Sequence, residues 1–570
     1  MRKLRRIVVA AALAGALLWW WLRGSGPGIE PGSILLVDLS GSFVEAAEPP
    51  LLSRLLGDSS RSFTALLSDL RKAERDRRIA GVLFRVRGLE IGWAKAQELR
   101  GAIQSLDAAG RRTLAFLELG MGSNREYYVA TAAQEVRASP GSANPLVGLA
   151  AEFLFLGGLW EKLGAGFEVE GVGEYKSAVE TLTGTQMSPA HREMAASLLD
   201  STDAQFVGGI AESRGLSEKV VRRAIDAGTA SPDEMRAQGL VDEVCHFDEA
   251  LASLGEGPVV ERDDYSQVDP KSVGFEPVAK FALVYGAGAV SLGRASPSPS
   301  GTLRMASDDL AEALEEIAKD DDIRAVVLRI DSPGGSAQAA EVIWRAVRRA
   351  RESGKPVVAS VSDLAASGGY YAAAAADAIV APPASQVGSI GVFLMRPVLG
   401  ELLGKLGIGV ETMTRGARAD LLLASQPLSE STRAQLRSEI ESTYELFLAR
   451  VAEGRALPRE RVHELGRGRV WTGAQAAERG LVDGLGGLRE AVAKARELAG
   501  LTPEADVALV PYPRTRTLIE EVQGALRRAA LALSPPPLPL PPLALRLADW
   551  LAAAPPGTPG LLPPLFVEIH

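Results

Sequence analysis

Cysteine and histidine are scarce in this chain of 570 residues. Cys245 is the single cysteine, so no disulfide can form within the chain, and a metal site built from cysteine and histidine is disfavoured. An excess of basic residues is also missing, because the net charge is −9. A chain of this charge is a poor partner for nucleic acid. We therefore expect neither a metal centre nor a nucleic-acid interface.

An uninterrupted apolar run of 16 residues occupies positions 7–22, with four basic residues before it and Arg23 after it. It is shorter than the ~20 residues that usually span a bilayer. The basic flank should stay in the cytoplasm, which places the rest of the chain on the other side of the membrane. A cleaved signal peptide also fits, but three tryptophans at 19–21 stand where cleavage needs small residues. We therefore favour an uncleaved signal anchor over residues 1–24.

The chain also contains an internal duplication. The segment NREYY (124–128) matches SGGYY (367–371) at an offset of 243 residues, and AGVLFRV (80–86) matches RAVVLRI (324–330). QGLVDEV (238–244) matches RGLVDGL (479–485) at a slightly smaller offset. The matches predict two homologous domains, 33–255 and 277–500, joined by a linker over 256–276.

Short β-branched runs alternate with helical stretches in each half, which predicts an α/β fold with parallel sheets. In the second half we expect strands at 325–330, 356–361 and 378–381, an amphipathic helix at 339–352 and a further helix within 429–453. A C-terminal extension covers 501–570. It is rich in proline from about residue 530, where we expect no regular structure.

Three glycine-bearing turns follow successive strands of the second half: DSPGGS (331–336), AASGGYY (365–371) and VGSIGV (387–392). Glycine lets a ligand approach the backbone closely, and loops at the carboxyl ends of parallel strands form the ligand crevice. Tight turns alone would explain any one of the three, but a run of three favours a site. Ser367 lies before a helix expected to begin at Gly368, where free N–H groups can hold an oxyanion. We predict that Ser367 is a nucleophile.

A serine nucleophile needs a general base. Of the four histidines, His246 follows the first repeat and His570 ends the tail, while His191 and His463 are expected on solvated helix surfaces. A Ser-His-Asp triad is therefore disfavoured. A lysine whose pKa is lowered by burial is the remaining choice.

The duplication indicates which lysine acts as the base. The second half has no lysine between Lys405 and Lys494, and its segment 414–436 aligns with 173–194 so that an alanine stands opposite Lys176. Conversely, the first half has Asn124 opposite Ser367. Each half has kept one member of a Ser/Lys pair and lost the other, which favours Lys176 as the base over an ordinary surface lysine.

At these residues the sequence resembles the long form of the signal peptide peptidase SppA family (protease IV), within the ClpP/crotonase-like group. The resemblance covers roughly residues 33–500 and the N-terminal anchor. It rests on EYKSAVE (174–180), DSPGG (331–335), DLAASGGYYAAAAAD (363–377) and VGSIGV (387–392).

The resemblance implies two tandem ClpP/crotonase-like α/β domains behind a transmembrane helix. It implies that Lys176 is the general base and Ser367 the nucleophile of a serine peptidase. It assigns the oxyanion to the backbone N–H groups of Gly335 and Gly368, and a supporting hydroxyl to Ser389.

The resemblance also implies a biological setting. The substrates would be cleaved signal peptides and other short apolar peptides, and the assembly a homotetramer without a metal or cofactor. The chain would be held in the inner membrane by a single span, with its domains on the periplasmic side. The Pro-rich tail lies outside the family pattern. Two alternatives remain open at this point: a crotonase-like acyl-CoA enzyme and a non-catalytic oligomeric membrane scaffold.

Overall fold

The computed structural model describes residues 28–46, 61–120, 124–143, 146–295, 303–512 and 560–561. Within these ranges no helix has the length and apolar character needed to cross a membrane. The predicted anchor over residues 1–24 lies outside them, as does the Pro-rich tail apart from residues 560–561.

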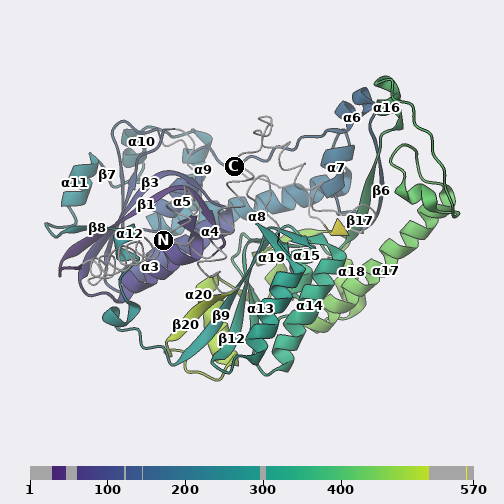
Figure 1. The fold of residues 1–570 in the computed structure, drawn as a ribbon. Coiled ribbons are helices and arrows are strands. Elements are labelled where there is room, and N and C mark those ends of the chain that lie inside the picture. Colours follow the sequence, from purple (N-terminus) through teal and green to yellow (C-terminus); the bar gives the residue numbers. More distant parts are fainter. Residues whose placement is uncertain are drawn as a thin grey trace, which may run out of the picture.

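Two sheets with the same strand order form the body of the protein (Figure 1). The first runs β8-β1-β3-β4-β5-β7, and every neighbouring pair is parallel. The second runs β20-β9-β12-β14-β15-β19, again with parallel neighbours throughout. This agreement confirms the predicted parallel α/β fold and is what a duplicated sequence should give.

The strands of the first sheet are β1 (Ser33–Val44), β2 (Arg61–Ser62), which pairs with β1, β3 (Ile79–Glu90), β4 (Arg112–Leu117), β5 (Glu135–Ala138), β7 (Glu243–Val244) and β8 (Val259–Glu261). Those of the second are β9 (Ala279–Ala287), β12 (Ile323–Ser332), β14 (Val357–Ala366), β15 (Ala378–Ala381), β16 (Gln386–Gly388), β18 (Val470–Thr472), β19 (Gly484–Leu485) and β20 (Val507–Tyr512).

The helices follow the same duplication. Those of the first half are α3 (Phe63–Arg75), α4 (Trp93–Ala108), α5 (Asn124–Ala130), α6 (Gly157–Leu163), α7 (Ala178–Thr183), α8 (Pro189–Arg214), α9 (Glu218–Asp226), α10 (Pro232–Ala237), α11 (Phe247–Ala252) and α12 (Arg262–Tyr265). Those of the second are α13 (Ser307–Lys319), α14 (Ala337–Glu352), α15 (Gly368–Ala373), α16 (Gly400–Lys405), α17 (Glu430–Arg455), α18 (Arg459–Leu465), α19 (Gly473–Ala477) and α20 (Leu488–Leu498).

Individual hydrogen bonds also recur in the two halves. The hydroxyl of Tyr127 donates to the carbonyl of Leu240 at 2.7 Å, and that of Tyr370 donates to Leu481 at 2.7 Å. Both tyrosines and both leucines belong to the motifs that match between the halves of the sequence. The duplication is therefore preserved in the packing as well as in the strand order.

The edge strands β8 and β20 come from segments that the sequence did not mark as part of either sheet. β8 lies within 256–276, which reads as a linker, and β20 lies beyond residue 500. Each pairs in parallel with the first strand of its own half, β8 with β1 and β20 with β9. The two segments thus complete equivalent sheets.

The β-branched runs become strands because helices cover both faces of these parallel sheets. All six residues of the run 325–330 in β12 are buried. The neighbouring helix α14 buries Ile343, Trp344 and Val347 on one face. Its first turn is capped by the hydroxyl of Ser336, which accepts a hydrogen bond from the N–H of Ala339 at 3.3 Å.

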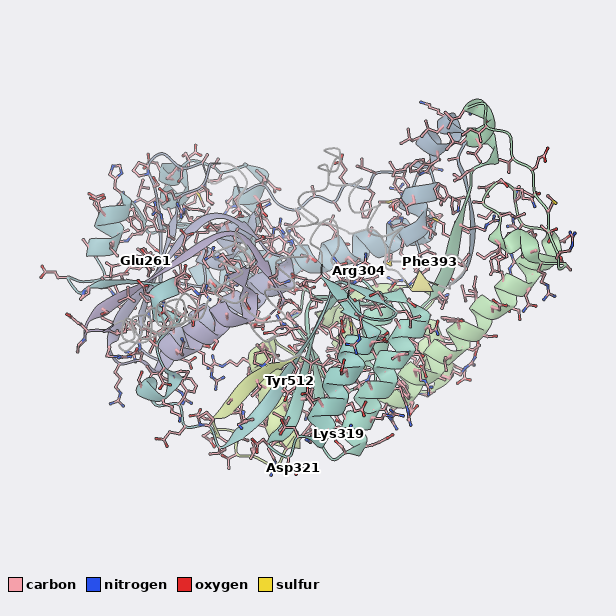
Figure 2. The ribbon with its side chains drawn as sticks, viewed as in Figure 1. Glu261, Arg304, Lys319, Asp321, Phe393 and Tyr512 are labelled. Carbon is pink, nitrogen blue, oxygen red and sulfur yellow. The ribbon has the colours of Figure 1, made fainter. Side chains whose placement is uncertain are left out.

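A third, smaller sheet joins the two halves. Its order is β11 (Arg304–Ala306), β10 (Ala289–Ser291), β13 (Gly335–Ser336), β21 (Gly560–Leu561), β17 (Val392–Val398) and β6 (Gly166–Val172). The strands β6 and β17 pair antiparallel along their whole length, although they come from different halves. They form a narrow ribbon at the right of Figure 1, away from the first sheet and alongside α17, and Figure 2 labels Phe393 on this ribbon.

Charged side chains from both halves meet in the interior between them. Arg329 of β12 has no exposed surface, and its Nη2 donates to Glu45 Oε1 at 2.8 Å and to Glu98 Oε2 at 2.7 Å. Glu45 and Glu98 belong to the first half. A buried cation with two carboxylate partners is stable only as a set, because removing one member leaves the others unpaired.

Replacing Arg329 with leucine is therefore expected to destabilise the protein by about 3–5 kcal/mol, since two buried carboxylates lose their cation. The free energy of unfolding in urea measures the effect. Arg324→Leu, on the exposed side of the same strand, is the matched control and should change stability by no more than about 0.5 kcal/mol. Equal effects of the two substitutions would contradict the structural role given to Arg329.

Candidate active site

The structure brings Lys176, Ser367 and Ser389 together within one chain. Lys176 Nζ lies 2.8 Å from Ser367 Oγ, 2.8 Å from the carbonyl oxygen of Ser389 and 2.9 Å from Ser389 Oγ. Ser367 and Ser389 have no exposed surface, and Lys176 is 5% exposed. The three residues that the sequence analysis selected from separate motifs thus form one buried cluster.

Ser367 occupies a sharp turn between strand β14 and helix α15. Its backbone has φ 55° and ψ −117°, a conformation that non-glycine residues rarely adopt. The turn is held by hydrogen bonds on both sides: the Ser367 N–H donates to the Gly388 carbonyl at 2.7 Å, and the Tyr371 N–H donates to the Ser367 carbonyl at 2.8 Å. Such strain at a fixed turn is typical of functional sites, where surrounding contacts stabilise it.

Lys176 reaches this cluster from the first half because β6 is paired with β17. The chain leaves β6 at Val172 and passes Gly173, whose φ is 109°. It is then fastened to the loop 466–469: the Tyr175 N–H donates to the Arg467 carbonyl at 2.9 Å. A Cβ at Gly468 would fall 2.4 Å from Lys176 N, so this close approach requires glycine.

The same loop positions Ser389. The Ser389 N–H donates to the Arg469 carbonyl and the Gly468 N–H donates to the Ile390 carbonyl, both at 2.7 Å. Loop 466–469 therefore sets the distance between Lys176 and Ser389. The sequence analysis did not select this loop, although its Gly-Arg-Gly-Arg pattern between a helix and a strand was a usable signal.

Burial decides the protonation of Lys176. Removal from water is the cause that lowers its pKa well below the ordinary value of 10.5. Its three polar contacts are all with uncharged oxygens. A buried lysine without a carboxylate beside it is held as a neutral amine, and a neutral amine can accept a proton.

Gly335 and Gly368 lie together beside Ser367. A Cβ at Gly368 would fall 3.2 Å from the Gly335 nitrogen. Gly368 is the first residue of α15, so its N–H has no acceptor within the helix. A Cβ at Gly335, where φ is 156°, would fall 2.1 Å from the Val290 carbonyl oxygen. Glycine is therefore needed at Gly335, and the two N–H groups are positioned as neighbours.

The expectation that His191 is solvated is wrong. Its side chain has no exposed surface, and Nδ1 lies 3.1 Å from Glu180 Oε2. The Phe153 ring packs edge-on against it, with the centroids 5.1 Å apart. His463 is exposed, as expected, and its Nδ1 lies 3.0 Å from the Tyr444 hydroxyl. Neither histidine contacts Ser367.

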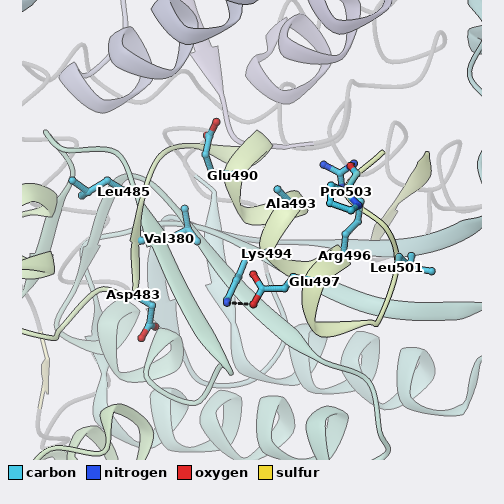
Figure 3. Close-up of a pocket in the computed structure, with 11 residues that line it drawn as sticks. Val380, Asp483, Leu485, Glu490, Ala493, Lys494, Arg496, Glu497, Leu501 and Pro503 are labelled. Atoms are coloured by element: carbon cyan, nitrogen blue, oxygen red, sulfur yellow. Dashed lines mark hydrogen bonds and ion pairs between the residues drawn. The ribbon is translucent and has the colours of Figure 1, made fainter. Parts of the chain in front are cut away.

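A pocket of about 620 Å³ lies elsewhere, along α20 (Figure 3). It is lined by charged side chains that include Asp483, Glu490 and Lys494. None of Lys176, Ser367 and Ser389 lines it. The reactive cluster is thus separate from this surface pocket.

The comparisons with known proteins agree with this geometry. The family described as Peptidase family S49 matches residues 114–261 and 349–502, one segment in each half. The chain is 32% identical over 517 residues to "Serine protease SPPA, chloroplastic" of Arabidopsis thaliana, covering 89% of this chain and 75% of that protein. It is 30% identical over 532 residues to "Protease 4" of Salmonella typhi, covering 88% and 83%. The chain belongs to peptidase family S49.

Membership of family S49 decides between the functional alternatives. The relatives at this identity are named as proteases, so the chain is a serine peptidase rather than an acyl-CoA enzyme or a scaffold. Among solved structures, a ClpP1 mutant from Listeria monocytogenes aligns over 37% of this chain and 94% of its own, at 14% identity and a TM-score of 0.24. The α/β assignment rests on the sheets described above.

The burial of Lys176 has a measurable cost in stability. In the unfolded S49 chain the amine binds a proton below its ordinary pKa of 10.5, whereas the folded pKa is lower. Between these two values only the unfolded state holds the proton, so the native protein loses about 1.4 kcal/mol for each pH unit below 10.5. We expect the stability of Lys176→Met, relative to wild type, to be greater at pH 8 than at pH 10.

Denaturant unfolding at the two pH values measures this difference. Lys494→Met, which removes a partly exposed lysine of α20, is the control. A Lys176→Met advantage that does not change with pH would mean that the folded protein holds this amine charged.

Proposed function

We propose that this family S49 peptidase cleaves short apolar peptides with a Ser/Lys dyad, in which Lys176 is the general base and Ser367 the nucleophile. The observation that carries the proposal is the 2.8 Å approach of the buried Lys176 Nζ to Ser367 Oγ. Apart from Lys176, the residues described around Ser367 include no group that is suited to take its proton. His191 and His463, the histidines considered as alternatives, do not contact Ser367.

Burial favours the neutral form of the amine, and the three contacts can accommodate that form. A neutral amine has two N–H donors and one lone pair, and Lys176 has three oxygen neighbours. The carbonyl oxygen of Ser389 can only accept, so it takes one N–H, and Ser389 Oγ takes the other. The lone pair is then directed at Ser367 Oγ, where it can receive the hydroxyl proton. In this arrangement Ser389 orients the base through two of its atoms.

The reaction follows from these positions. Lys176 accepts the proton as Ser367 Oγ attacks the peptide carbonyl, and the N–H groups of Gly335 and Gly368 donate to the developing oxyanion. Lys176 then protonates the leaving amine, and water hydrolyses the acyl ester with the same lysine as base. Each oxyanion donor typically contributes about 2.7–4 kcal/mol to the stability of the transition state.

The third sheet supports an extended peptide as the substrate. Residues 560–561 of the chain form a short strand, β21, between β13 and β17, and Leu561 is antiparallel to Gly335. The space beside the proposed oxyanion donor therefore accepts a backbone in β conformation, as peptides that add a strand to a sheet require. Phe393 of the neighbouring strand β17 and Val290 of β10, one strand beyond β13, are buried apolar residues that suit apolar side chains.

The sequence supports a membrane setting for this activity. The apolar run at 7–22 with its basic flank is expected to anchor the chain in the inner membrane and to leave both repeats on the periplasmic side. Signal peptides left in the membrane after cleavage are apolar and lie close to such an anchor. They are therefore the substrates that we propose.

Replacing either dyad residue tests the mechanism. Ser367→Ala and Lys176→Ala should each lower kcat/KM on a quenched fluorescent apolar peptide by roughly 10³-fold or more, because nucleophile and base act as a unit. In the wild type, kcat/KM should rise with pH through a midpoint below 10.5, as Lys176 loses its proton. Lys494→Ala should leave both the rate and the midpoint unchanged. A Lys176→Ala variant that keeps most of the rate would rule out the dyad.

A homotetramer is the assembly that we propose, and the tip of the ribbon offers a surface for it. Four exposed apolar side chains follow α16 along the chain: Leu406, Ile408, Met413 and Leu422, with exposed fractions of 65%, 50%, 90% and 84%. Exposed apolar side chains that form one surface are typical of a contact with another chain. A second copy presents the same side chains.

Sedimentation of the full chain in detergent tests this assembly. The double substitution Leu406→Asp with Ile408→Asp should reduce the mass from that of an oligomer to that of one chain, because it places charges in the contact. Val278→Asp, at an exposed apolar residue far along the chain, should not. An unchanged mass would exclude the tip as the contact.

A further inference from the structure

A second buried lysine, Lys95, contacts the two strands that lead to the reactive loops. Its Nζ donates to Asp331 Oδ2 at 2.6 Å and to Asp363 Oδ2 at 2.7 Å. Asp331 lies four residues before Gly335, and Asp363 lies four residues before Ser367. One ammonium group of the first half thus joins the segment that carries the oxyanion donor to the segment that carries the nucleophile.

The backbone pairing between these two strands is irregular at this point. β12 and β14 pair in register as far as Ile330 with Val361, and the next pair is Ser332 with Ala365. Asp331 alone therefore stands opposite the three residues 362–364. The ladder that would normally fix two neighbouring strands is interrupted where the loops begin, and Lys95 supplies a side-chain connection across the gap.

Asp363 also caps the first turn of helix α4, which belongs to the first half. Its Oδ1 accepts hydrogen bonds from the N–H groups of Ala94 and Lys95, both at 3.1 Å. Helix α4 has Gly92 as its N-cap residue, which offers no side chain, so the carboxylate takes that place. A Cβ at Gly92 would fall 2.1 Å from Asp363 Oδ1. The first half therefore holds Asp363 through both a backbone cap and an ion pair.

The charges fit a permanent clamp. Burial lowers the pKa of Lys95, but the carboxylates of Asp331, Asp363 and Glu45 outweigh it and raise that pKa above the ordinary value, so the amine stays charged. Lys95 thus differs from Lys176, which is buried without a carboxylate. The first half therefore contributes two buried lysines: Lys95, which is charged, and Lys176, whose burial favours the neutral amine.

We propose that Lys95 is a positioning residue, which holds the segment leading to Gly335 in a fixed relation to the segment leading to Ser367. The proposal rests on the dyad function given above and extends it. Oxyanion stabilisation requires the N–H donors to lie at the place that the oxygen will occupy, and a small displacement of one loop against the other weakens it. The clamp acts on the transition state more than on substrate binding.

Three lysine variants of the full chain test this role. Lys95→Met removes the charge and keeps a similar length, and Lys95→Arg keeps the charge. Lys72→Met is the matched control, because Lys72 is also 5% exposed and paired, with Asp69 at 3.0 Å, but it contacts only the first half and residues 265–268 after it. Each variant is measured below its unfolding temperature with the apolar peptide substrate.

Lys95→Met should lower kcat by about 10- to 100-fold and change KM by less than about threefold, because the loops are misplaced in the transition state. The pH midpoint of kcat should stay where it is in the wild type, since Lys95 does not contact Lys176. Lys95→Arg should recover part of the lost kcat. Lys72→Met should lower the unfolding temperature and leave kcat within about twofold of wild type.

Any one of three results would overturn the proposal. The first is a folded Lys95→Met variant with wild-type kcat, and the second is an equal loss of kcat in Lys72→Met. The third is a shifted pH midpoint in Lys95→Met, because it would mean action through the base. Ser367→Ala, measured in parallel, separates this proposal from the function on which it rests. If Ser367→Ala is inactive and Lys95→Met keeps the wild-type kcat, only the positioning role fails; if Ser367→Ala keeps its activity, the dyad itself fails.

Discussion

The pairing of β6 with β17 is the constraint on which the site depends. It places a strand of the first repeat in a sheet of the second, and the chain that follows this strand carries Lys176 to Ser367. Ion pairs of Glu168 and Glu170 with Arg396 and Arg433 stabilise this contact between the two halves. Without this ribbon the proposed nucleophile would lie in one domain and the proposed base in the other, with nothing to fix the distance between them.

Buried ion pairs connect the two halves, with the cation on one half and its carboxylate partners on the other. Arg329 and Lys95 each meet two carboxylates from the opposite half, so these buried ion pairs join the two halves. Breaking such a set is costly because it leaves a buried charge without a partner. Lys176 differs from these groups: burial lowers its pKa, and its hydrogen-bond partners are the uncharged oxygens of Ser367 and Ser389. The same half thus holds one lysine whose pKa is raised by carboxylates, Lys95, and one whose pKa is lowered by burial, Lys176.

The sequence selected Lys176 and Ser367 because each half of the duplication differs from the other at one of the two positions. Lys176 and Ser367 each stood opposite a residue that cannot perform the same chemistry, and the structure places the two 2.8 Å apart. The strands at 325–330, 356–361 and 378–381 and the helix at 339–352 are confirmed, since long apolar or amphipathic runs determine their own structure.

Other features depended on contacts that no local pattern reveals. His191 lies in a polar stretch, yet its face of α8 turns inward against Phe153 and Glu180. The strand β8 has three residues and β20 contains Pro511, so neither is recognised as a strand of a sheet before the edge that receives it is known. The pairing of β6 with β17 and the contacts of Lys95 with Asp331 and Asp363 both join residues that are far apart in the chain. The membrane anchor at 1–24 and the assembly stay predictions.

The order of the parts along the chain has a consequence for biosynthesis. Lys176 is made first and Ser367 much later, but Ser389 and the Lys176 segment are both fastened by carbonyls of loop 466–469. A nascent chain that has not yet reached Arg469 contains the nucleophile and the base without the loop that holds them in place. The growing polypeptide should therefore remain inert toward itself and its neighbours until loop 466–469 has been made.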